Sequence, residues 1–314
     1  MELLLAIEGG GTKTRLLLTD ARGEILAREA GGPASGLYIS RSVYAREIAK
    51  LLGRIRRAAH DCGGRIATVG LAGPMDRMLV EETARRVLGN VRFVRTGESE
   101  IAFALHGIEW GVSLIAGTGA SCRVRTPEGA STGCGGFGPQ FGDEGSGYWI
   151  GRSAISAAMQ AWDGRGPTTA LTERLCAFYG LSRVFDILRL VDRSGHVSGT
   201  KIAACVPEVF AAAREGDAVA KGICREAGLA LGRLAVATTR KVEWSQSPVP
   251  LVLTGGVFHG GPLILKPLRS ALRAVGLPYC MYPVIPEPTE GIIRIIQRDR
   301  TQKRESRRSK HVSG

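Results

Sequence analysis

The sequence predicts an α/β protein built from two copies of a mixed β-sheet flanked by helices. Strand-length apolar runs at 3–8, 14–20 and 24–30 are separated only by "GGGTK" and "ARG", a pattern typical of an antiparallel meander. Alternating helix and strand patterns follow over 40–97, which predicts strand–helix–strand units. The stretch 110–131 then repeats the order of strand, Gly/Thr turn, strand and hairpin, which indicates a second copy of the fold.

Hydrophobic spacing predicts the remaining elements. We expect a helix over 40–63, a strand at 66–73, a helix at 80–90 and a strand at 91–97. Further along we expect mainly helices over 145–240, a buried strand entering a glycine turn at 249–261, and a last helix after "PEPTEG". The expected domains are 1–109 with 289–300, and 110–288, followed by a basic disordered tail at 301–314.

The composition favours a soluble protein of the cytoplasm. Of the 314 residues 44% are hydrophobic, yet no apolar run approaches the ~20 residues that span a bilayer, and "MELLLAI" is too short for a signal sequence. The net charge of +13 falls to +8 without 298–314 and shows no basic stripe, so nucleic-acid binding is not favoured. The seven cysteines lie singly, which predicts free thiols and no metal cluster.

Three glycine-rich turns carry the functional signal. In 9–14 the glycines let backbone N–H groups crowd around an anion, although the spacing is not that of a P-loop and an ordinary hairpin is the alternative. The turn at 117–121 has the same chemistry, and 254–257 ends a buried strand with a bend that lets the backbone approach a ring or ribose. Together the turns predict a divided nucleotide site, with phosphates between the first two and adenosine against the third.

The order of four motifs resembles that of one family. "IEGGGTKT", "IAGTGASCRV", "GCGGFGPQFGDEGSGYWIGRSAI" and "LTGGVF" resemble the BadF/BadG/BcrA/BcrD-type ATPases, and among them the N-acetylglucosamine kinases and archaeal-type hexokinases. The resemblance extends to about residue 297. It implies two RNase-H-like domains of the actin-like ATPase superfamily, each with a mixed five-stranded sheet, and an interdomain cleft. It also implies ATP, Mg²⁺, phosphoryl transfer to a sugar hydroxyl, and a homodimer.

The resemblance assigns nucleotide contacts to all three turns. The residues for the β- and γ-phosphates are Gly10, Gly11, Thr12 and Lys13 on one side and Gly117, Thr118 and Gly119 on the other. The residues for adenosine are Gly216, Gly255 and Gly256. Where the family carries Asp, this chain has Glu8, which we expect to hold Mg²⁺ through water. Because Glu is one methylene longer, we expect weaker metal binding rather than loss of function.

The same resemblance assigns the acceptor site. Aligned by "SEIAFAL", Glu98 takes the place of the Asp that accepts the proton of the sugar hydroxyl, with Glu100 as a near neighbour and a helix cap as the alternative role. The expected sugar contacts are Ser35, Glu98, Ser121, Gly136, Phe137, Gly138 and Asp143. Asp143 and Glu144 are expected at a helix start, where capping is the alternative. Because Ser35 and Ser121 replace two family asparagines, the identity of the sugar stays open.

Two other functions are compatible with the motifs. Glu8 and Glu98 both replace Asp, which fits an ATP-binding relative without catalysis, although the turn glycines, Thr12, Lys13 and Asp143 are retained. An ATPase activator of 2-hydroxyacyl-CoA dehydratases would need cysteines for an iron–sulfur cluster, and Cys134 is the one candidate. We therefore expect an ATP-dependent sugar kinase.

Overall fold

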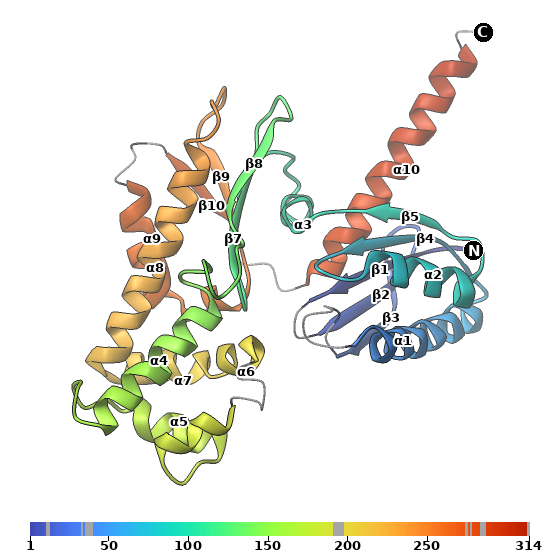
Figure 1. The fold of residues 1–314 in the computed structure, drawn as a ribbon. Helices are drawn as coiled ribbons and strands as arrows, with labels where there is room; N and C mark the ends of the chain where they lie inside the picture. Colours follow the sequence, from blue (N-terminus) through green and yellow to red (C-terminus); the bar gives the residue numbers. More distant parts are fainter. Residues whose placement is uncertain are drawn as a thin grey trace. The chain divides into compact units, whose positions relative to one another are not determined.

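The chain forms two compact units. The computed structural model describes residues 1–10, 13–32, 34, 40–190, 198–273, 276, 278–282 and 287–312. Unit 1 comprises Met1–Glu109 and Pro286–Gly314, and unit 2 comprises Trp110–Ile285 (Figure 1). Among the residues described, no helix combines the length and apolarity that crossing a membrane requires.

Unit 1 is built on a mixed five-stranded sheet, as predicted. Its strands are β1 (Glu2–Gly9), β2 (Thr14–Asp20), β3 (Ile25–Gly31), β4 (Arg65–Ala72) and β5 (Arg92–Arg95). They lie in the order β3-β2-β1-β4-β5. The first three form the expected antiparallel meander, whereas β4 runs parallel to β1 and β5 parallel to β4.

Helices cover both faces of this sheet because alternate residues of β1 enter different cores. The helices are α1 (Arg41–Asp61), α2 (Arg77–Leu88), α3 (Glu98–Leu105) and α10 (Pro288–Val312). Leu3, Leu5 and Ile7 pack with buried residues of α1 and α2. Leu4 and Ala6 pack on the other face with residues of α3 and α10. The side-chain alternation of one strand thus fixes which helix pair lies on each face.

The C-terminal segment differs from the expectation. Residues 301–314 were predicted to be disordered, but α10 continues to Val312 (Figure 1). Between Gly291 and Val312 the sequence contains no Gly or Pro and is rich in Arg and Lys, which have high helix propensity. Charge density was therefore a poor guide to the backbone here.

Unit 2 repeats the sheet of unit 1. Its strands are β6 (Gly111–Ala116), β7 (Ala120–Arg125), β8 (Ser131–Gly135), β9 (Val249–Thr254) and β10 (Tyr279–Tyr282). The order β8-β7-β6-β9-β10 matches β3-β2-β1-β4-β5, and the parallel and antiparallel pairings match as well. The repeat seen in the sequence is thus a repeat of topology.

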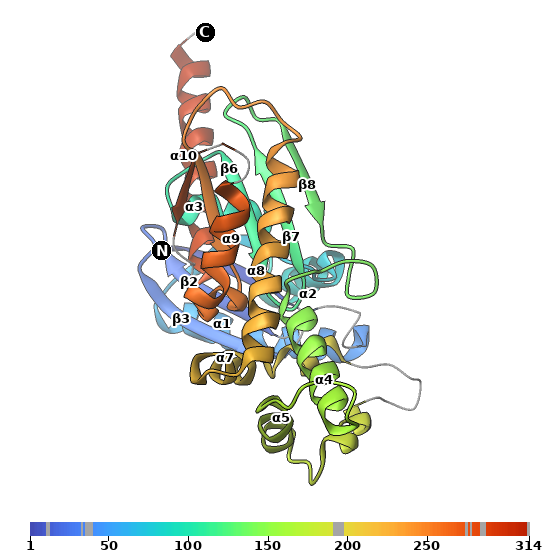
Figure 2. The same cartoon turned by 90° about the vertical axis from the view of Figure 1, so that its left-hand side faces the viewer.

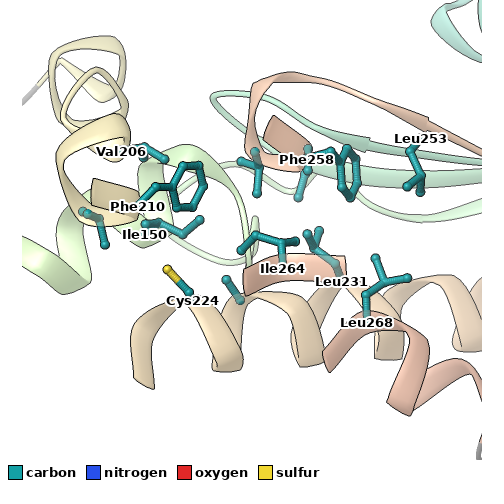
Figure 3. Packing of buried hydrophobic residues seen from close by; sticks show 14 of the residues in the cluster. Ile150, Val206, Phe210, Cys224, Leu231, Leu253, Phe258, Ile264 and Leu268 are labelled. Atoms are coloured by element: carbon teal, nitrogen blue, oxygen red, sulfur yellow. The ribbon is translucent and has the colours of Figure 1, made fainter. Parts of the chain in front are cut away.

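A long insertion of helices gives unit 2 its larger core. The helices are α4 (Gly147–Trp162), α5 (Leu171–Tyr179), η1 (Val184–Leu190), α6 (Gly199–Ala203), α7 (Val206–Glu215), α8 (Ala218–Thr239), η2 (Gly256–Gly260) and α9 (Pro262–Arg273). Figure 2 shows α8 and α9 running alongside each other across the sheet. Phe210, Leu231, Phe258, Ile264 and Leu268 meet in the core between these helices and β9 (Figure 3).

Candidate active site

The first glycine turn joins β1 to β2 in unit 1. The Gly10 amide donates to the Lys13 carbonyl at 2.8 Å, and the Ala34 amide donates to the Gly10 carbonyl at 3.0 Å. The side chain of Lys13 is exposed. Gly11, Thr12 and Ser35, three of the predicted site residues, lie outside the described residues. What is described is a tight turn with an exposed cation beside it.

Glu8 forms an ion pair that the motifs did not indicate. It lies opposite Arg15 in the β1–β2 register, and Arg15 Nη1 donates to Glu8 Oε2 at 2.7 Å. The Glu8 side chain is 16% exposed and that of Arg15 25%, so water screens the pair only in part. The predicted metal ligand thus has a cationic partner within its own hairpin.

The predicted catalytic base starts α3. Glu98 is the first residue of that helix and is exposed, whereas the cap is supplied by its neighbour. Glu100 Oε2 accepts from the Gly97 amide at 2.9 Å and from Thr96 Oγ1 at 2.8 Å. The near neighbour Glu100 therefore takes the capping role. Glu98 lies one turn before Ile101, which packs onto the sheet, so both residues share one side of α3.

The two candidate carboxylates of unit 1 lie at the same edge of the sheet. Strands β1, β4 and β5 are parallel, so their carboxyl ends meet there. Glu8 is opposite Ala72 of β4, and the Thr96 amide after β5 donates to the Leu71 carbonyl of β4 at 3.0 Å. Glu98 follows two residues later as the first residue of α3, so it lies beyond the carboxyl end of β5.

The second glycine turn is held by the start of α4 in unit 2. The Gly117 amide donates to the Gly119 carbonyl at 2.9 Å, which closes the turn between β6 and β7. The Gly147 amide donates to the Gly117 carbonyl at 2.8 Å, and the Tyr148 amide to the Thr118 carbonyl at 3.1 Å. Two of the N–H groups that a helix N-terminus leaves without intrahelical partners therefore fix the turn.

Asp143 precedes α4 but does not cap it. Ser146 is the N-cap, with its Oγ accepting from the Trp149 amide at 3.1 Å, so Asp143 and Glu144 lie just before the helix start, as expected, and neither of them is the N-cap. The reason is the turn over 143–146, in which the Asp143 carbonyl accepts from the Ser146 amide at 3.0 Å. Asp143 itself has a φ of 62°, which is uncommon outside glycine.

The Asp143 carboxylate is buried against the second turn. Oδ1 accepts from the Ala120 amide at 3.1 Å, and the residue is only 7% exposed. A Cβ added to Gly119 would lie 2.8 Å from Oδ2, so a side chain at that position would displace the carboxylate. Burial raises the pKa of Asp143 above its usual range and the charge of Glu144 adds to this, against the lowering effect of the Ala120 N–H. A carboxylate held in this way can accept from a ligand hydroxyl or interact with a cation.

The loop before Asp143 carries the other predicted sugar contacts. It leaves β8 where the Gly136 amide donates to the Ala120 carbonyl at 2.9 Å, so both ends of the loop are bonded to Ala120. Ser121 follows Ala120 on β7. Phe137 is 73% exposed. Phe141 is 83% exposed on the same loop and was not singled out from the sequence, although it stands in the "FGPQFGDEG" motif.

The third turn brings β9 against the second turn. A Cβ on Gly255, whose φ is +107°, would lie 2.3 Å from the Ala116 carbonyl oxygen. Gly216 is the left-handed C-cap of α7, and two residues earlier Arg214 donates to the His259 carbonyl of η2 at 3.3 Å. Gly255, Gly256 and Gly216 are thereby placed on neighbouring elements of unit 2.

Unit 1 contains the counterpart of Gly255, which sequence reasoning missed. Gly73 follows β4 as Gly255 follows β9, with a φ of +92°, and a Cβ there would lie 2.1 Å from the Gly9 carbonyl oxygen. In both units a glycine after the second parallel strand contacts the end of the central strand. The signal was available, because "LAG" at 71–73 matches "LTG" at 253–255 after a buried strand.

No alternative metal centre accompanies these turns in the part of the chain that the structure describes. That part contains no group of three or more His, Cys, Asp or Glu residues able to hold a metal ion. All seven cysteines are free, as predicted. The groups available to a charged ligand are thus the glycine turns, their nearby cations, and the single carboxylates Glu8, Glu98 and Asp143.

Comparison with known proteins places the chain among sugar kinases and ATPases. It is 32% identical over 280 residues to the N-acetylmuramic acid/N-acetylglucosamine kinase of Clostridium acetobutylicum, covering 87% of this chain and 91% of that protein. It is 29% identical over 272 residues to the N-acetyl-D-glucosamine kinase of Dictyostelium discoideum, covering 81% and 85%.

Solved structures agree with this placement. One from Chromobacterium violaceum, provisionally named an N-acetylglucosamine kinase, has a TM-score of 0.67 at 25% identity and covers 93% of this chain and 97% of its own. The ROK family glucokinase of Streptomyces griseus, solved with glucose and AMPPNP, shares the fold with a TM-score of 0.54 at 18% identity, covering 93% and 97%. The model of the BadF/BadG/BcrA/BcrD ATPase family matches residues 5–274, and the chain belongs to that family.

Proposed function

We propose that this chain is an ATP-dependent kinase that phosphorylates a hydroxyl group of an N-acetylated amino sugar. The names of its curated relatives support this substrate class, because both act on N-acetylglucosamine. The observation that carries the proposal is the repeated glycine turn. Both units place a tight turn after their central strand, and in unit 2 the turn adjoins the buried carboxylate of Asp143.

In this proposal the three turns bind ATP. Gly10, Gly11, Thr12 and Lys13 hold the β- and γ-phosphates together with Gly117, Thr118 and Gly119, and the adenosine contacts Gly216, Gly255 and Gly256. Backbone N–H groups in such turns favour anions, and Lys13 adds a positive charge. Phosphoryl transfer needs positioning and charge neutralisation more than covalent chemistry. The backbone N–H groups of the turns and the charge of Lys13 would supply both.

The residues present fit a Mg²⁺ ion bound with ATP. Glu8 provides one carboxylate at the end of β1, beside the first turn. Mg²⁺ ordinarily uses one or two carboxylates, substrate phosphates and several waters, so a larger cluster of ligands is not required. We assign Glu8 as the residue that holds the ion through water. The ion would neutralise charge on the phosphates during transfer.

We assign Glu98 as the base that accepts the proton of the attacking hydroxyl. Its exposure and its position at the start of α3, just after the carboxyl end of β5, support this assignment. Asp143 would accept hydrogen bonds from sugar hydroxyls, and its raised pKa reflects a carboxylate already shielded from water. The remaining proposed sugar contacts are Ser35, Ser121, Gly136, Phe137 and Gly138.

The test is Mg²⁺-dependent ADP release with a panel of sugars that includes N-acetylglucosamine, N-acetylmuramic acid, glucosamine and glucose. We expect an N-acetylated sugar to stimulate ADP release, with sugar phosphate formed in equal amount. Glu98→Gln should lower kcat on the order of 10³-fold, within the range for general bases. The matched control is Glu100→Gln, whose amide oxygen can still accept from Gly97. Equal losses in both variants would exclude Glu98 as the base, and ATP binding without any stimulation would favour a non-catalytic binder.

We also propose that the protein acts in the cytoplasm as a homodimer. The resemblance to the family supports the dimer. Sedimentation analysis of the purified chain tests it, and a monomer at micromolar concentration would contradict it.

A further inference from the structure

Arg15 binds the Glu8 carboxylate, which is the group that the proposed function assigns to Mg²⁺. Arg15 Nη1 lies 2.7 Å from Glu8 Oε2, across the second register pair from the turn. A water bound to a metal ion would donate to a carboxylate oxygen at this same distance. The guanidinium and the hydrated ion are therefore alike as partners of Oε2, because each is positively charged and donates a hydrogen bond to it.

The surroundings make this pair more than an ordinary surface contact. Both side chains are mostly buried, and they lie on the face of the sheet that also carries Ala6 and Leu17 and is covered by α3 and α10. The backbone on both sides is fixed, because Glu8 and Arg15 belong to paired strands. A cross-strand pair with fixed backbones holds its carboxylate in one place.

On the basis of the proposed function, we infer that Arg15 is a positioning residue that stands in for Mg²⁺ at Glu8 until the metal–nucleotide complex binds. Arg15 orients the Glu8 carboxylate and balances its charge in the free protein. When the ion and its water arrive they compete with the guanidinium for Oε2. Arg15 thus weakens the affinity of the site for Mg²⁺ while it improves the placement of the carboxylate.

The inference makes opposite predictions for metal binding and for turnover. Without the competing cation, Glu8 attracts Mg²⁺ more strongly, so Arg15→Gln should increase the gain in ADP affinity caused by Mg²⁺ by about fivefold. The Glu8 carboxylate then loses the hydrogen bond that orients it. Because small displacements of a catalytic group are costly, kcat at saturating Mg²⁺ should fall about tenfold. Arg15→Lys keeps the charge and should retain the wild-type gain within about twofold.

The experiment is calorimetric titration of ADP into each variant, with Mg²⁺ and with EDTA. Arg54→Gln is the matched control, because Arg54 pairs with Glu29 at the same 2.7 Å in the same unit but away from the turn. In a Glu8→Gln background, Arg15→Gln should leave the Mg²⁺-dependent gain unchanged, and this comparison decides the matter if the single variant folds poorly.

Two results would overturn the inference. One is an unchanged Mg²⁺-dependent gain in Arg15→Gln, equal to that of Arg54→Gln. The other is an equal loss of ADP affinity with and without Mg²⁺, which would mean that Arg15 binds phosphate directly. A wild-type protein that binds ADP and Mg²⁺ but phosphorylates no sugar would remove the proposed function and leave the calorimetric comparison valid.

Discussion

The two units share one sheet topology but equip their glycine turns differently. In unit 1 the turn is bordered by charged side chains, namely the Glu8–Arg15 pair and the exposed Lys13. In unit 2 the turn is fixed by backbone hydrogen bonds from the start of α4, and its carboxylate, Asp143, is buried and held by a backbone amide. The same frame therefore carries an ion pair and an exposed lysine in one copy, and a buried carboxylate held by a backbone amide in the other.

Under the proposed function, this difference would divide the binding roles between the two copies. Charged side chains beside a turn suit a metal ion and phosphates, which arrive and leave in each turnover. A buried acceptor of fixed direction suits selection of a hydroxyl pattern, since a misplaced partner leaves it without a hydrogen bond. What the copies share is the glycine that contacts the central strand, Gly73 in unit 1 and Gly255 in unit 2.

Substitution of the shared glycines should have the largest effect on stability. Both glycines have a positive φ. Gly73→Ala would place a Cβ 2.1 Å from a carbonyl oxygen, and Gly255→Ala would place one 2.3 Å from a carbonyl oxygen. We expect each to lower the free energy of unfolding by about 3 kcal/mol, measured by urea titration. The control Gly129→Ala has a similar φ of +93° but open space, and should cost about 1 kcal/mol. A cost at Gly73 no larger than at Gly129 would show that the copies do not share this constraint.

Neutralising the rigid carboxylate of unit 2 should have the next largest effect. Asp143→Asn can keep the bond from the Ala120 amide but loses the charge, so kcat/KM for the sugar should fall on the order of 10²-fold with ADP binding nearly unchanged. Glu144→Gln, at the adjacent exposed acid, should change kcat/KM less than about threefold. Steady-state kinetics and ADP calorimetry on both variants measure this. Equal effects at 143 and 144 would indicate a general influence of charge instead of a specific contact.

The sequence predicted the repeated frame and its chemistry better than the local geometry of the site. Glycine turns between apolar runs carry their own backbone requirements, so their positions could be read directly. The Glu8–Arg15 pair could not, because it depends on a strand register that places residue 15 opposite residue 8. Capping stayed an alternative role for Asp143 because acids before a helix often cap it, and the sequence did not show that Ser146 takes this role three residues later.

Burial also escaped sequence reasoning. Phe137 and Phe141 are apolar residues that the structure leaves exposed, while Asp143 is a charged residue that it buries. Such exceptions arise from the path of the loop, whose two ends both bond to Ala120. They coincide with the candidate site, where local rules are expected to give way to function.

The smallest expected effect is on the pH dependence of stability, and it has opposite signs at two aspartates of unit 2. Burial raises the pKa of Asp143 above its ordinary 3.8, so the folded state binds that proton more tightly, and ionisation costs stability as the pH rises through the folded pKa. At Asp217 burial is outweighed by hydrogen bonds from the Ala220 and Ala170 amides and Thr169, which lower the pKa, so its contribution is present above 3.8 and lost as the pH falls through the folded pKa.

Asp143→Asn should therefore raise the free energy of unfolding near neutral pH by about 1 kcal/mol, and the gain should shrink towards about pH 4. Asp217→Asn should lower it by a similar amount near neutral pH, and this loss should also shrink in acid. Urea titrations of both variants and the wild type across this pH range make the measurement. A loss of stability in Asp143→Asn at neutral pH would mean that the buried carboxylate stabilises its turn, and unit 2 would then resemble unit 1 in depending on a paired charge.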